Sequence, residues 1–125
     1  MENQLDLFNL KEKSAKLHLT RPLAVFDLES TGVDFVKDRI VEMSVLRIEP
    51  DGAKSITTFR LNPTIPIPVE ASMVHGIYDE DVVTCPTFKE KAQHIFDLLD
   101  PCDLAGFNSN RFDIPMLLEE FIRAG

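Results

Sequence analysis

The segment Ile40–Ile48 places the strongest limit on the fold, because its apolar residues do not keep to one face. Isoleucine, valine, methionine and leucine occupy both odd and even positions along it. A strand with this pattern suits the interior of a sheet that is covered on both faces. The sequence therefore predicts a layered α/β fold with this segment as an internal strand.

Two further segments are expected to pair as strands in the same sheet. Leu23–Leu28 is a short apolar run with valine and phenylalanine, which is typical of a buried strand. Pro50-Asp51-Gly52 is a turn signal, so Ser55–Leu61 should pair back as a hairpin. Together with the internal strand, these segments predict an antiparallel three-strand meander.

The second half of the chain reads as a loop followed by helices and one strand. Asn62–Val69 contains three prolines, which exclude a regular sheet interior and favour an extended loop. Thr87 begins a capping box, and apolar residues then recur at helical spacing until Asp100-Pro101 ends the helix. Asp103–Phe107 is predicted to be a short strand, and helical spacing resumes at Ile114.

Length, charge and cysteine content limit the class of protein. A chain of 125 residues predicts one domain, here residues 22–125, preceded by a mostly polar, flexible tail at 1–21. Two cysteines without zinc spacing, no signal peptide and no membrane-length apolar run fit a cytoplasmic protein without a membrane partner. The net charge of −8 argues against broad electrostatic binding to nucleic acid. It does not exclude an enzyme whose acidic site binds divalent cations.

The acidic residues around the first strand suggest a metal site. Asp27 and Glu29 are two apart, so they share one face of the strand while Leu28 points to the other. Adjacent carboxylates repel each other, and a hard cation such as Mg²⁺ or Mn²⁺ would relieve that repulsion. The alternative is a strand end with two solvated acids. Asp113, at the start of the last helix, is a third candidate whose alternative role is helix capping.

Four segments, taken in order, resemble the DnaQ-like (DEDD) exonucleases of the ribonuclease H-like superfamily. Asp27–Gly32 resembles their first exonuclease motif, and Asn108–Asp113 is similar to the second, with Asp113 as its carboxylate. Asp38–Glu42 matches a recurring second-strand pattern. Asn62–Ile77 resembles the linking segment, including its His-Gly-Ile signature. The resemblance extends from the first strand to the end of the chain.

The resemblance implies a ribonuclease H-like mixed sheet, in which a parallel strand joins the meander and helices flank it. It also implies 3′→5′ hydrolysis of nucleotides by two divalent cations, Mg²⁺ or Mn²⁺. Asp27, Glu29 and Asp113 would be the catalytic metal ligands. His75 and Phe112 would stack on the terminal nucleotide; their alternatives are a surface histidine and a core phenylalanine. The full set expected to bind substrate is Leu28, Ser30, Thr31, Gly32, His75, Asn108 and Phe112.

Two elements of the family pattern are not found in this sequence. The family has a fourth carboxylate and, in its commonest branch, a histidine base on a later helix, but no histidine follows Asp113. The expectation is a domain truncated before its last strand and helix, and inactive alone. Its exposed sheet edge and apolar surface would favour self-association.

The tail carries a separate motif. Gln4, Leu5, Asp6, Leu7 and Phe8 resemble the pentapeptide with which bacterial replication and repair proteins bind the sliding clamp. The alternative is that these apolar side chains pack on the domain itself. A clamp motif favours action on a single-stranded DNA 3′ end in proofreading or repair. Trimming of oligoribonucleotides, and a non-catalytic clamp- or nucleic-acid-binding module, are the competing functions.

Overall fold

The computed structural model describes residues 19–106 and 113–125. The predicted clamp motif Gln4–Phe8 and the predicted substrate residues Asn108 and Phe112 therefore lie outside the described residues. Leu19 already packs against the buried cluster of Val25, Leu46 and Ile48.

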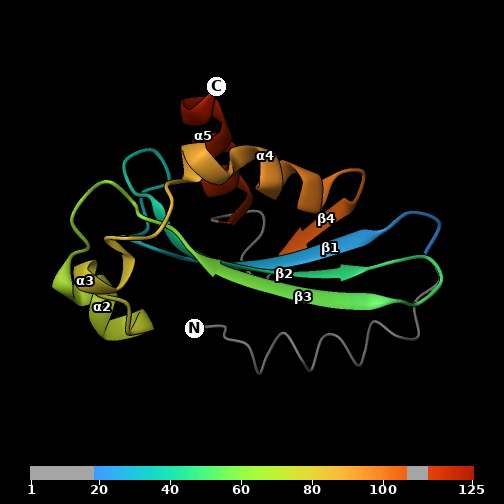
Figure 1. The fold of residues 1–125 in the computed structure, drawn as a ribbon, viewed down its shortest axis with the longest axis horizontal. Coiled ribbons are helices and arrows are strands. Elements are labelled where there is room, and N and C mark those ends of the chain that lie inside the picture. Colours follow the sequence, from blue (N-terminus) through green and yellow to red (C-terminus); the bar gives the residue numbers. More distant parts are fainter. Residues whose placement is uncertain (1–18, 107–112) are drawn as a thin grey trace.

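A four-stranded mixed sheet forms the centre of the fold (Figure 1). Its strands are β1 (Leu23–Ser30), β2 (Ile40–Ile48), β3 (Lys54–Arg60) and β4 (Asp103–Gly106). In the order β3-β2-β1-β4, β2 pairs antiparallel with both β1 and β3, while β4 runs parallel to β1. The predicted meander with an added parallel strand is confirmed.

Two helices cover one face of this sheet, α4 (Phe88–Leu99) and α5 (Ile114–Ala124) (Figure 1). The main core lies between them and the sheet, and the α4 N-terminus carries the predicted capping box of Thr87 and Glu90. The largest buried group comprises Ala24, Phe26, Leu28, Ile40, Met43, Val45, Leu61, Phe88, Ile95, Leu99, Met116 and Leu117. The even-numbered residues of β1 thus face the helices.

Two short helices were not predicted from the sequence, α2 (Val69–His75) and α3 (Asp79–Val82). They lie together at one end of the sheet (Figure 1). Pro68 precedes α2, and Gly76 ends it with a φ of 75°. Proline at the start of a helix and glycine just past its end are typical boundary residues. Pro68 and Gly76 were therefore the features of the sequence that could have predicted α2.

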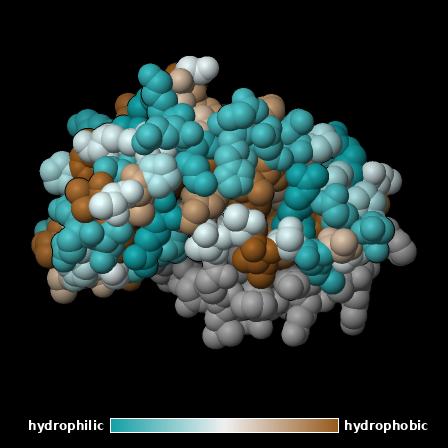
Figure 2. Space-filling model, viewed as in Figure 1, coloured by the Kyte–Doolittle hydropathy of each residue, from teal (hydrophilic) through white to brown (hydrophobic). Residues whose placement is uncertain are grey.

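The surface seen in Figure 2 is mostly hydrophilic, with hydrophobic residues in small separate patches. Some of these patches lie at the end formed by α2 and α3, where Val69, Met73 and Val74 are exposed. Among the helices of the described residues, none has the length and apolar character needed to cross a membrane.

Candidate active site at the end of strand β1

Asp27 and Glu29 lie on the face of β1 that points away from α4 and α5. Leu28 packs into the core under the helices, whereas Val25 packs with Leu46 in a separate cluster on the opposite face. Because side chains alternate along a strand, Asp27 and Glu29 share the face of Val25. Both are half-buried. The two carboxylates therefore project from the same side near the end of a strand whose other side is fixed in the core.

The neighbouring strands extend this polar face. Asp27 pairs with Ser44 and Glu29 with Glu42 across the antiparallel ladder. Glu42 in turn pairs with Arg60 of β3, whose Nε lies 3.1 Å from its Oε2. The Arg60 guanidinium thus offsets part of the negative charge beside the acidic pair. Arg60 had no motif to mark it in the sequence; only the register of β2 and β3 brings it here.

Asp113 is placed differently from the other two acids. It precedes α5, is 1 % exposed and makes no side-chain capping hydrogen bond to that helix. Over residues 19–106 and 113–125, the structure has no group of three or more acidic, histidine or cysteine side chains at metal-binding spacing. The role of Asp113 as a third ligand beside Asp27 and Glu29 therefore stays a prediction from its place in the sequence motif.

The donor set of Asp27 and Glu29 nevertheless fits a divalent cation. Carboxylate oxygens are the ligands that Mg²⁺ and Mn²⁺ prefer. Mg²⁺ is commonly bound through one or two carboxylates, with water and substrate phosphate completing its shell. Two half-buried carboxylates on one strand face meet that requirement.

The chain after the acidic pair, residues 31–39, forms a tight connection between β1 and β2. The buried Thr31 donates its hydroxyl hydrogen to Asp38 Oδ1 at 2.8 Å and accepts from the Arg39 amide at 3.0 Å. A Cβ on Gly32 would overlap the Asp38 carboxylate, so any other residue there would have to displace the Asp38 side chain from its bond with Thr31. The Thr31 side chain is thus used inside the connection, and that of Leu28 packs in the core.

His75 fixes the backbone immediately after the acidic pair. Its Nδ1 accepts from the Ile77 amide at 3.1 Å, so Nε2 carries the proton and donates to the Ser30 carbonyl oxygen at 3.0 Å. Burial lowers the pKa of His75, against the opposing effects of the Ser30 hydrogen bond and the Glu42 charge. The neutral ring thus ties the end of α2 to the end of β1. Both ring nitrogens are bonded to backbone, and the predicted stacking of the ring on a nucleotide stays a prediction.

This tie predicts a specific loss of stability in acid. The pKa of His75 is lower in the folded chain than its usual value of 6.5. The stabilisation is therefore fully present above that value and is lost as the pH falls through the lowered pKa. The free energy of unfolding, measured by urea titration between pH 8 and pH 5, should fall more steeply in the wild type than in His75→Gln. Parallel curves for the two proteins would contradict this assignment.

Comparison with known proteins gives one family match and several relatives. A family model described as Exonuclease (RNase_T) matches residues 24–125. The DNA polymerase III subunit epsilon of Buchnera aphidicola is 28% identical over 109 residues, covering 82% of this chain and 46% of the relative. Protein NEN1 of Arabidopsis thaliana is 31% identical over 114 residues, covering 82% and 23% respectively.

A solved structure shares the fold. Escherichia coli exonuclease I in complex with a dT13 oligonucleotide superposes with a TM-score of 0.75 at 19% identity, covering 84% of this chain and 24% of that one. The mixed sheet with its helices is thus the ribonuclease H-like arrangement of exonuclease I. The chain spans about half, or less, of the length of the relatives it matches.

Proposed function

We propose that this chain, which belongs to the exonuclease family, forms the catalytic part of a metal-dependent 3′→5′ exonuclease acting on DNA. The observation that carries the proposal is the acidic pair Asp27 and Glu29, which share one strand face within the region that matches the family. Two acids that were merely solvated at a strand end would have no need to lie half-buried on one face of the strand. The half-burial of this pair, with Leu28 fixed in the core behind it, favours a bound cation.

Asp27 and Glu29 would hold divalent cations, Mg²⁺ or Mn²⁺, with Asp113 as a third ligand. Two such ions would supply the attacking hydroxide and offset the charge that develops on the phosphate. The protein's part is to hold both carboxylates in register, which the β1–β2 ladder does through the pairs Asp27–Ser44 and Glu29–Glu42. Asp113 is assigned from its place in the second motif.

The 3′-terminal nucleotide would bind beside this pair. We assign the backbone of Ser30–Gly32, the ring faces of His75 and the motif residues Asn108 and Phe112 to that role. A DNA substrate is favoured by the relative named as a DNA polymerase III subunit and by the exonuclease I complex with dT13. Proofreading or repair is the corresponding process.

A direct assay tests this function in the protein at its full natural length. A 5′-labelled single-stranded DNA should shorten stepwise from its 3′ end with Mg²⁺ or Mn²⁺, and EDTA should stop the reaction. An RNA of matched sequence separates DNA exonuclease activity from oligoribonucleotide trimming. Failure to shorten either strand with either metal would reject the enzyme and leave a non-catalytic binding module.

The tail motif gives a second, independent proposal: Gln4–Phe8 binds a bacterial sliding clamp. Leu7 and Phe8 would be the apolar anchors, and anchors of this kind dominate binding energy. A labelled tail peptide should bind clamp in fluorescence anisotropy, and the double change Leu7→Ala, Phe8→Ala should weaken binding at least about 100-fold. Glu2→Gln is the matched control outside the motif. A native peptide that does not bind would reject the motif without touching the nuclease assignment.

A further inference from the structure

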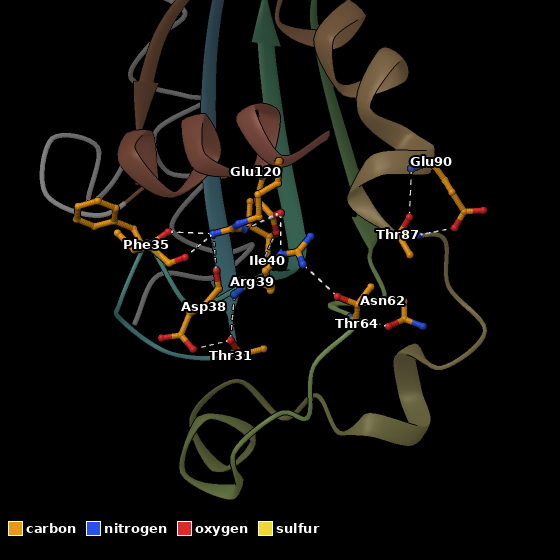
Figure 3. Close-up of polar contacts among 12 residues, drawn as sticks. Thr31, Phe35, Asp38, Arg39, Ile40, Asn62, Thr64, Thr87, Glu90 and Glu120 are labelled. Atoms are coloured by element: carbon orange, nitrogen blue, oxygen red, sulfur yellow. Dashed lines mark hydrogen bonds and ion pairs between the residues drawn. The ribbon is translucent and has the colours of Figure 1, made fainter. Parts of the chain in front are cut away.

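Glu120 of α5 is a buried carboxylate outside the proposed metal site. It is 1 % exposed and accepts three hydrogen bonds. Its donors are Arg39 Nε at 2.9 Å, the Ile40 amide at 2.9 Å and Arg123 Nη1 at 3.0 Å. Figure 3 shows Glu120 reaching from α5 to Arg39 and Ile40 at the start of β2. A buried charge is stable only when it is paired in this way, so these contacts are strongly specified.

Arg123, one turn further along α5, holds the β1–β2 connection directly. Its Nη2 donates toward the carbonyl oxygens of Val36 at 2.9 Å, Phe35 at 3.3 Å and Asp38 at 3.4 Å. Its other nitrogen is bonded to Glu120. We call this set of contacts from Glu120 and Arg123 to residues 35–40 the α5 brace.

The brace acts where the regular sheet pairing stops. The β1–β2 register shifts between Glu29 and Ser30, so the ladder that holds the acidic pair does not continue evenly into the connection. Beyond this point, the bond from the Thr31 amide to the Arg39 carbonyl closes the connection. Glu120 binds the next amide of β2, that of Ile40. The acidic pair is therefore held by the ladder, and the connection by α5.

We infer that Glu120 and Arg123 are positioning residues for substrate binding. They fix residues 31–39, and through the Thr31–Arg39 contacts they fix Ser30–Gly32, the backbone that would face the terminal nucleotide. Since Asp27 and Glu29 are held separately, weakening the brace should impair nucleotide affinity more than the chemical step. The inference rests on the proposed function for its substrate, but its structural part can be measured without activity.

Hydrogen exchange tests the structural part on the chain itself. In Glu120→Gln, the amides of the connection should exchange roughly tenfold faster or more, since hydrogen bonds to a charged group are lost. The amides to follow are those of Thr31, Lys37, Asp38, Arg39 and Ile40, with Phe26 and Val45 in the ladder as internal reference. Glu119→Gln, one position earlier on α5, is the matched control and should exchange as the wild type. Equal acceleration of the reference amides, or none in the connection, would overturn the brace.

Kinetics test the functional part in the full-length protein. Glu120→Gln should raise KM for single-stranded DNA about tenfold with kcat within about twofold, because a single charge-assisted contact is worth about that factor. Arg123→Lys keeps the charge but not the planar donor set, so it should likewise raise KM and leave kcat nearly unchanged. It replaces Glu120→Gln in the test if that variant does not fold. Faster exchange with unchanged KM would overturn positioning. A wild type without nuclease activity would reject the proposed function, and the exchange result would still decide the brace.

Discussion

Replacing Asp27 or Glu29 by its amide, D27N or E29Q, is expected to lower the rate of 3′ nucleotide release by at least about 100-fold. The amide keeps the size of the side chain and removes the charge that would hold a divalent cation. Both residues lie in the ladder of β1 with β2, and neither is fully buried. The fold should therefore survive. The thermal midpoint should be close to that of the wild type or higher, because the substitution removes the repulsion between two neighbouring carboxylates.

Glu42 offers a matched control for these variants. It lies opposite Glu29 on the same face of the sheet, but its carboxylate is paired with Arg60. E42Q should change the rate less than about tenfold, because it removes a partly exposed ion pair and no proposed ligand. The measurement is single-turnover shortening of labelled DNA, with Mn²⁺ binding followed by calorimetry. If D27N and E29Q retained wild-type rates and Mn²⁺ affinity, the acidic pair would not be the metal site.

Phe88→Ala is expected to destabilise the chain by about 3–5 kcal/mol, the range for a large aromatic side chain in a packed core. Phe88 is the first residue of α4 and is 1 % exposed. Its ring meets Phe121 of α5 edge-on, with centroids 5.0 Å apart. Loss of the ring would leave a cavity between both helices and the sheet. Because domains of this kind have about 5–15 kcal/mol in total, the variant should lie near the limit of folding.

Phe96 provides the comparison on the same helix. It is 50% exposed, so F96A should cost no more than about 1 kcal/mol. Both values come from urea unfolding followed by circular dichroism. Similar losses for the two variants would mean that the α4–α5 contact does not form the core described here.

The sheet was predictable from the sequence because its signals are local. Ile40–Ile48 is apolar on both faces, and β2 has these bounds in the structure. The helix after Thr87 was predictable for the same reason, since its capping box and apolar spacing lie within the helix itself. β1 continues past its apolar run Leu23–Leu28 to Ser30, and antiparallel pairing with β2 keeps the acidic pair inside the strand, as the spacing of two predicted.

The surroundings of the candidate site were less predictable, because they depend on contacts between distant residues. Arg39 and Glu120 meet across 81 positions, and His75 reaches Ser30 across 45. Neither contact has a spacing that periodicity could reveal. The acidic pair itself was found by its spacing of two, whereas the position of Asp113 depends on how α5 sits on the sheet.

The hydrogen bond from His75 to the Ser30 carbonyl also limits where residues can be inserted into this domain without disturbing the site. Residues 62–68 form a surface loop rich in proline, the kind of segment in which insertions are usually harmless. Here the length of that loop determines where α2 lies, and the last residue of α2, His75, must reach the end of β1 with its imidazole. The loop length is therefore part of the geometry of the site, and fusion tags or engineered insertions belong instead at the β2–β3 turn around Gly52, which lies at the other end of the sheet.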